Sequence, residues 1–211
     1  MAGTHELTIA ETGMPGEILA ETAVGPRAFG WWGMVWLIAT EATLFALLLA
    51  SYFYIRFRSG TEWPLAGIEP PKLELPLIMT VILWSSSLPV HIAEKGIEKG
   101  DQGRLKGGLA MGWILGAVFL FITLAVEWPE TLKEFSPRTN AYGSLFFTIT
   151  GFHASHVVVG LSVSMWTQAR AWQGAFDEKR HLTVQNFAMY WHFVDIVWLF
   201  VLLTVYFSPH L

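Results

Sequence analysis

Residues 30–54, GWWGMVWLIATEATLFALLLASYFY, form an apolar stretch that contains a single charged residue, Glu41. A helix of about 20 apolar residues crosses a bilayer, so this stretch is long enough to span one. A carboxylate near the middle of such a helix is costly in lipid. We therefore expect Glu41 to face other helices and to have a polar partner there.

The composition of the whole chain indicates a membrane protein. Of its 211 residues, 53% are hydrophobic and 14% are charged, whereas about a quarter of the residues of a soluble domain are charged. The net charge of -4 gives no reason to expect nucleic acid as a partner. The chain has no cysteine, which excludes disulfides, thiolate metal sites and iron–sulfur clusters.

Five apolar segments predict an all-α integral membrane protein, a five-transmembrane-helix bundle in one membrane domain over residues 30–211. The expected spans are about 30–56, 75–94, 107–127, 141–170 and 187–207, and we expect residues 127–140 to form a polar loop. Residues 1–29 lack the basic start and apolar core of a secretory signal, so they read as a retained polar tail. Basic residues are more numerous in the segments that lie on the same side of the membrane as the N-terminus. This bias predicts a cytoplasmic N-terminus and a C-terminus outside.

Polar residues inside the expected spans are the candidate site. Glu41 lies roughly 16 Å from the start of its span, and His153 and His156 lie roughly 18 and 22 Å from the opposite start of theirs. All three are therefore at similar depth, and we expect Glu41 to meet His153 or His156 in a buried proton-binding or structural network. We also expect Glu41 to be protonated or strongly hydrogen-bonded, because its helix is apolar.

A second polar group is expected nearer the inner surface. His91 and Glu94 end the second span, while His192 and Asp195 open the fifth, so the four side chains can form one network. In the third span, small residues recur every four positions and predict a helix-packing seam; they are Gly108, Gly112 and Gly116.

Three interpretations of the buried residues remain open. Spacing alone favours a structural hydrogen-bond network that sets helix register. A proton-binding site is the second, and a freestanding proton-coupled transporter would use one. The third is a metalloenzyme that binds zinc or iron through Glu41, His153 and His156. We expect no catalytic residue and no metal in this chain.

Two longer motifs are more specific. TGFHASHVVVG (150–160) and YWHFVDIVWLF (190–200) resemble the signature helices of subunit III of haem–copper terminal oxidases, the cytochrome c oxidase subunit 3 family. The segment 33–53 is similar to the helix of that family that carries a buried glutamate. The resemblance covers about residues 29–207. The chain departs from the best-known form in having five expected helices instead of seven, and in having Ala154 where glycine is frequent.

The resemblance implies a non-catalytic subunit of a cytochrome c oxidase, of the five-helix bacterial form, in the plasma membrane. Such a complex reduces O2 to water and translocates protons, and this subunit supports proton uptake and protects against inactivation during turnover. The resemblance implies direct packing against subunit I, with subunit II in the same complex. Haem and copper belong to those partner subunits, whereas this chain has none. The resemblance also implies that Glu41 is the family's carbodiimide-reactive glutamate.

Other partners and complexes stay open at this stage. Phospholipid is an expected ligand of the exposed groove, and the complex can belong to a larger respiratory supercomplex. A quinol oxidase or a nitric oxide reductase is the alternative complex for this subunit. The sequence does not contain the neighbouring subunit that would decide between these electron donors.

Overall fold

The computed structural model describes residues 29–60, 63–64 and 68–211. Within these ranges, five helices are long and apolar enough to cross a membrane. The predicted all-α fold with five spanning helices is therefore confirmed. The predicted polar tail, residues 1–29, lies outside the described residues except for Phe29.

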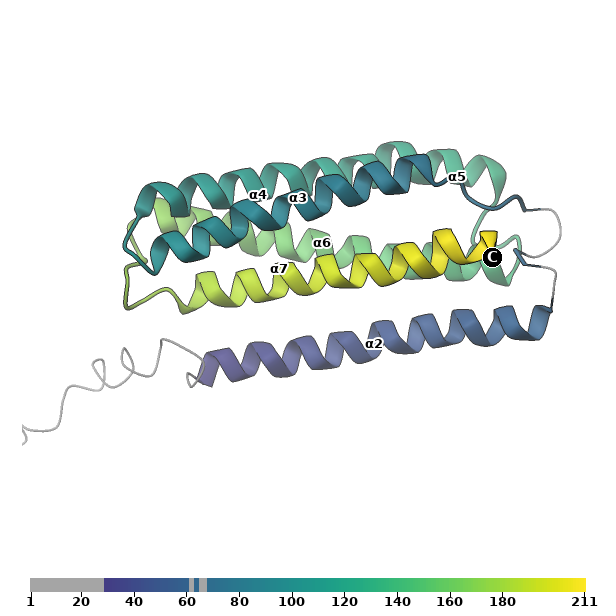
Figure 1. The fold of residues 1–211 in the computed structure, drawn as a ribbon, viewed down its shortest axis with the longest axis horizontal. Coiled ribbons are helices and arrows are strands. Elements are labelled where there is room, and N and C mark those ends of the chain that lie inside the picture. The colour runs from purple at the N-terminus through teal and green to yellow at the C-terminus, as the bar shows by residue number, and fades with distance from the viewer. Residues whose placement is uncertain (1–28, 61–62, 65–67) are drawn as a thin grey trace, which may run out of the picture.

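The five spans follow one another up and down the bundle (Figure 1). Three of them are single helices, α2 (Phe29–Ser59), α3 (Glu74–Ile97) and α6 (Ala141–Trp172). The third span is α4 (Gln102–Ile122), the π-helical turn η2 (Thr123–Glu127) and α5 (Trp128–Glu134). The fifth span is α7 (Leu182–Val201), the π-helical turn η3 (Leu202–Phe207) and the short 3-10 turn η4 (Ser208–His210).

The prediction of a loop over residues 127–140 is wrong for its first half, because residues 128–134 are helical. Pro129 favours a break in the helix on sequence grounds, since proline lacks an N–H and crowds the preceding turn. In the structure, Pro129 stands at the start of α5, directly after the wider turn η2. A proline in a first helical turn costs little, so the span continues to Glu134 and brings Glu127 inside the protein.

Helix starts are capped where the chain turns between spans. The Asp101 carboxylate accepts a hydrogen bond from the backbone N–H of Arg104 at the start of α4, at 3.0 Å. The Asn140 side-chain oxygen accepts one from the backbone N–H of Gly143 at the start of α6, also at 3.0 Å. Each bond satisfies a backbone donor that the helix itself leaves unpaired. These caps fix where two of the spans begin.

Helix α2 stands at the side of the bundle, next to α7 (Figure 1). Helices α3 and α4 form the most extensive helix pair, and α4 and α7 also pack on α6.

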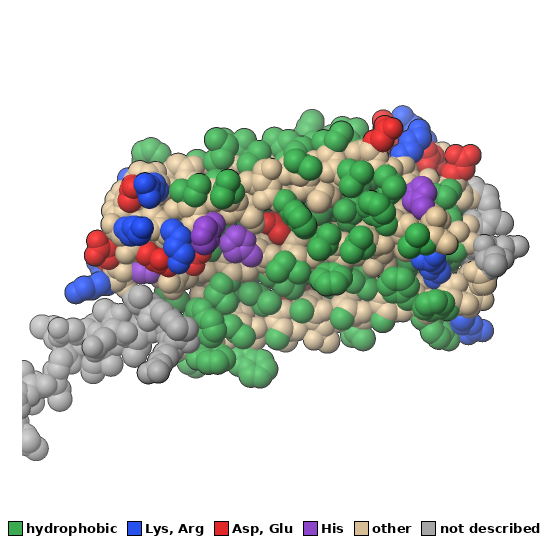
Figure 2. Space-filling view, in the orientation of Figure 1, with side chains coloured by type: hydrophobic (Ala, Val, Ile, Leu, Met, Phe, Trp, Pro, Cys, Tyr) green, Lys and Arg blue, Asp and Glu red, His purple; other side chains and the backbone are tan. Residues whose placement is uncertain are grey.

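We call the end of the bundle where α2 begins the Phe29 end, and the end where α2 finishes the Ser59 end. Figure 2 shows hydrophobic side chains over the middle of the visible face and charged ones gathered towards its two ends, as expected of a spanning bundle.

The three glycines of the predicted seam lie where α4 meets its neighbours. A Cβ on Gly112 would lie 2.6 Å from the Val90 side chain of α3. A Cβ on Gly108 would collide with the backbone oxygen of Pro89, which is also in α3. A Cβ on Gly116 would lie 2.6 Å from the Trp191 ring of α7. Small residues here let the helix backbones approach closely.

Trp191 occupies a slot between two glycines on different helices. Its ring lies against Gly116 of α4 on one side and Gly160 of α6 on the other, and a Cβ on Gly160 would lie 2.7 Å from it. The indole N–H donates to the Ser86 hydroxyl of α3 at 2.8 Å. One side chain of α7 therefore ties together α3, α4 and α6.

Candidate functional site

Glu41 and His156 meet across the interface between α2 and α6. The Glu41 Oε2 atom lies 3.0 Å from the His156 Nε2 atom. The Glu41 side chain is 31% exposed and that of His156 is 13% exposed, and the Phe45 ring packs on the imidazole. The polar partner expected for Glu41 is therefore a histidine of the fourth span.

The second hydrogen bond of His156 determines how protons are shared in this pair. The His156 Nδ1 atom lies 2.7 Å from the Phe152 carbonyl oxygen, and a carbonyl only accepts, so Nδ1 carries a proton. If Nε2 also carries one, the imidazole is a cation that donates to a Glu41 carboxylate. If Nε2 carries none, Glu41 is protonated and donates to it. In either form the pair is neutral and holds one proton in the bond between its members.

Helix α2 is attached to the bundle by hydrogen bonds at both ends and in the middle. At the Phe29 end, the Asn186 side chain donates to the Gly30 carbonyl at 3.2 Å. At the Ser59 end, the Tyr52 and Ser208 hydroxyls are 3.0 Å apart. Few side chains of α2 are buried, so apolar packing holds this helix only weakly. Between its two ends, the Glu41–His156 bond is the main polar attachment of α2 to the bundle.

His153 does not reach Glu41. It is 1% exposed and lies between the rings of Phe119 of α4 and Trp198 of α7, with centroid distances of 5.8 and 5.0 Å. Residues three apart on a helix differ by about 60° in direction, enough for His153 to face the core while His156 faces α2. Its two ring nitrogens have no hydrogen-bond partner among the described residues. Glu41, His153 and His156 therefore do not converge on one metal position.

The second expected network lies between α3 and α7, towards the Phe29 end. The rings of His91 and His192 have centroids 6.5 Å apart, and His91 Nδ1 lies 3.9 Å from Glu94 Oε2. Asp195 joins the group through Ser87, whose hydroxyl donates to the Asp195 carboxylate and lies 2.9 Å from His192 Nδ1. The structure thus brings the four predicted residues into one neighbourhood. Ser87, for which the sequence predicts no role, links two of them.

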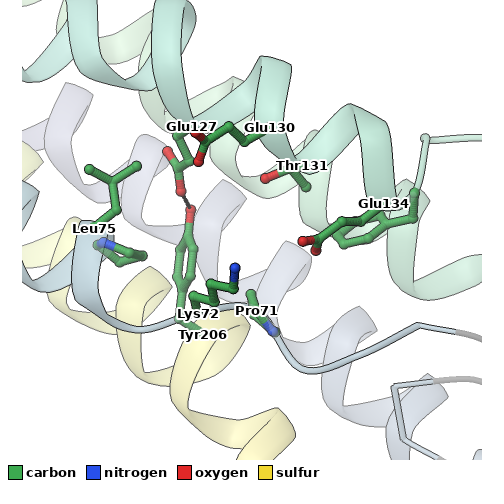
Figure 3. Close-up of a pocket in the computed structure, with 10 residues that line it drawn as sticks. Pro71, Lys72, Leu75, Glu127, Glu130, Thr131, Glu134 and Tyr206 are labelled. Carbon is green, nitrogen blue, oxygen red and sulfur yellow. Dashed lines mark hydrogen bonds between the residues drawn. The ribbon is translucent and has the colours of Figure 1, made fainter.

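Sequence reasoning also missed a buried pair near the Ser59 end. Glu127 is 4% exposed, and the Tyr206 hydroxyl of η3 donates to its Oε1 atom. Figure 3 shows Tyr206 pointing at Glu127. Both residues, together with Lys72, line a cavity of about 80 Å³. The signal was present in the sequence, since Glu127 directly continues an apolar span. The two prolines that follow concealed it.

These features define a class of protein, a membrane-spanning helical bundle whose polar side chains pair across helix interfaces. The family described as cytochrome c oxidase subunit III matches residues 15–209. Relatives named cytochrome c oxidase subunit 3 include those of Locusta migratoria, 33% identical over 184 residues, and Neurospora crassa, 35% identical over 184 residues. That of Gallus gallus is 34% identical over 180 residues. Each alignment covers 83% of this chain and 66 to 68% of the relative.

The chain belongs to the cytochrome c oxidase subunit III family. It is thus a multi-pass membrane protein and a subunit III of a terminal oxidase, and the resemblance drawn from its motifs is confirmed. It spans about two thirds of the length of the curated relatives that it matches.

Proposed function

We propose that this chain is the non-catalytic subunit III of a bacterial aerobic oxidase that takes electrons from cytochrome c. It packs directly on subunit I, with subunit II in the same complex. It supports proton uptake while the complex reduces O2 to water and translocates protons. Haem and copper lie in the partner subunits, and no redox centre lies in this chain.

The observation that supports a role in proton uptake is the Glu41–His156 pair. It joins a carboxyl group to an imidazole across the α2–α6 interface, and Glu41 is the one charged residue between positions 30 and 54 of its helix. Intramembrane carboxylates and histidines commonly act in proton relays. The pair can keep the α2–α6 interface closed without placing a net charge in lipid, and it can exchange its proton with a neighbouring pathway.

The proposed setting is the bacterial plasma membrane, with the Phe29 end facing the cytoplasm. The positions of basic residues support this orientation. Lys95, Arg104 and Arg180 all lie at the Phe29 end, where α3 ends, α4 begins and α7 begins. Basic residues favour the cytoplasmic side of a membrane protein.

The exposed face of α2 is proposed to contact lipid. Its large apolar side chains include Trp36, Leu47 and Phe57, which are 70%, 65% and 81% exposed. Phospholipid bound beside α2 is therefore an expected ligand, and membership of a larger respiratory assembly is a further proposal. A quinol oxidase or a nitric oxide reductase remains the second candidate for the complex.

Purification through an affinity tag on this chain in mild detergent tests the proposal. We expect haem-containing polypeptides to copurify, and the reduced-minus-oxidised visible spectrum to show the haem bands of a terminal oxidase. A copper site in the copurified subunit II would identify cytochrome c as the donor. A colourless preparation without partners would contradict the proposal and favour a freestanding transporter.

A further inference from the structure

Three metal-ligating side chains converge between α3 and α7 at the Phe29 end, outside the Glu41–His156 pair. They are His91, Glu94 and His192, and each offers one ligand atom within 4.8 Å of the other two. Two imidazoles and one carboxylate form a ligand set that zinc uses in proteins, with water in the fourth position. In Figure 2, histidine and acidic side chains lie close together on the visible face towards this end.

The hydrogen bonds of His192 prepare one ring nitrogen as a ligand. Ser87 has one hydroxyl proton, which it donates to the Asp195 carboxylate. Its oxygen must then accept from His192 Nδ1, 2.9 Å away, so Nδ1 carries the proton of the neutral ring. The Nε2 atom is left with a free lone pair. Metal-bound histidines are typically oriented in this way, by a bond from the second ring nitrogen to a nearby acceptor.

Among the described residues, Glu94 makes no ion pair with a lysine or an arginine. Its one ion-pair partner there is His91, at 3.9 Å, whereas the neighbouring Lys95 ammonium bonds both oxygens of Glu98 at 2.9 Å. The carboxylate charge is thus available to offset the charge of a bound metal. The His91 side chain is 53% exposed, so it is free to move towards a bound ion.

We propose that His91, Glu94 and His192 form a binding site for Zn²⁺, with Ser87 and Asp195 positioning His192. This departs from the sequence-based expectation that the chain binds no metal. Zinc ligand distances of about 2.0–2.2 Å require the three ligand atoms to approach one another more closely than in the free protein. Rotation of the exposed His91 side chain and of Glu94 provides that movement. A bound ion would join α3 to α7 in the half of the bundle nearer the Phe29 end.

Zinc titration of the full-length chain in detergent tests the site. After removal of metal with a chelator, the protein is equilibrated with buffered free Zn²⁺, and bound zinc per chain is measured by elemental analysis. We expect saturation at one zinc per chain. The Ser87→Ala variant should bind about 10- to 100-fold more weakly, as expected for loss of a residue that orients a ligand. His91→Ala, Glu94→Gln and His192→Ala should bind more weakly still.

The matched control is His210→Gln, because His210 lies at the Ser59 end and bonds the Pro71 carbonyl. It should bind zinc as the unmodified chain does. Co²⁺ provides a second readout, since a tetrahedral site produces visible absorption bands that Glu94→Gln should weaken, and circular dichroism checks that each variant keeps its helices. Absence of saturable zinc binding, or equal binding by His192→Ala and the unmodified chain, would overturn the proposal. Unchanged affinity of Ser87→Ala would overturn the positioning role.

Discussion

The Nε2 atom of His156 lies 3.0 Å from the Oε2 atom of Glu41, and these two residues lie 115 positions apart in the chain. Their bond joins α2, which has few buried side chains, to α6 in the bundle. Because the Phe152 carbonyl binds Nδ1 of the same ring, the pair holds one proton and no net charge. The first two predictions follow from this arrangement.

Removing either partner should loosen α2. We expect Glu41→Ala and His156→Ala each to destabilise the chain, with a coupling free energy on the order of 1 kcal/mol between them, as found for hydrogen bonds inside membrane proteins. A double-mutant cycle on reversible unfolding in mixed micelles measures it. Thr43→Ala is the control, because Thr43 bonds only within α2. Strict additivity of Glu41→Ala and His156→Ala would show that the pair contributes no coupling.

The protonated form of Glu41 should be visible by infrared spectroscopy. In an apolar setting the neutral form, in which the carboxyl donates to Nε2, is less costly than a carboxylate facing an imidazolium. We expect a protonated-carboxyl band that disappears in Glu41→Gln and persists in the control Glu98→Gln. If Glu41→Gln leaves every such band in place, Glu41 is not the proton carrier in the pair.

The slot around Trp191 should tolerate no added methyl group. Gly116→Ala and Gly160→Ala each place a Cβ within 2.7 Å of the indole ring. Overpacking of this kind costs about 1–3 kcal/mol, so the thermal midpoint in detergent should fall. Gly107→Ala is the control for Gly116→Ala, because both glycines are in α4 and a Cβ on Gly107 would meet nothing within 4 Å. Equal midpoints for Gly107→Ala and Gly116→Ala would show that the slot is not tight.

Loss of the Tyr206 hydroxyl should destabilise the Ser59 end. Glu127 is 4% exposed and receives its hydrogen bond from Tyr206. An unpaired buried polar group costs about 1–3 kcal/mol, so Tyr206→Phe should lower stability by that amount. Adding Glu127→Leu, which removes the stranded carboxyl, should restore part of the loss. Tyr54→Phe is the exposed control, and a Tyr206→Phe protein as stable as this control would contradict the account.

The turn between α6 and α7 should open in acid. The backbone N–H groups of Arg180 and Lys179 donate to the Asp177 carboxylate and hold the pKa of this exposed group below its usual value of 3.8. Since the folded pKa is the lower one, the stabilisation is complete above pH 3.8 and is lost as the pH falls through the lowered pKa. Hydrogen exchange of the Arg180 amide should accelerate there. The Asp177→Ala variant should show no such pH step.

The number of spans, and a histidine of the fourth span as the partner of Glu41, could be predicted because they depend on local hydrophobicity and on depth. Long apolar segments specify helices, and a carboxylate at the centre of one requires a partner at the same depth. The choice of His156 over His153 depends on how α6 rotates against α2 and α4. Spacing along one helix does not specify that rotation.

The Glu127–Tyr206 pair escaped prediction for a different reason. Pro129 and Pro137 indicated a loop, whereas the turn η2 allows the helix to continue past Pro129. Similarly, Ser87 gives no signal of its own in the sequence, because a serine in a spanning helix usually bonds its own backbone. Its link to His192 and Asp195 follows only from the packing of α3 on α7.

The rate of inactivation during turnover tests the central claim most directly. Oxidase is purified with Glu41→Ala and, in parallel, with the α2 control Thr43→Ala, and O2 consumption is followed until activity is lost. We predict that Glu41→Ala oxidase, with this subunit still bound, starts at a normal rate and inactivates after fewer turnovers than the control. Equal lifetimes of the two preparations, both with the subunit retained, would contradict a role for the Glu41–His156 pair in sustaining proton uptake.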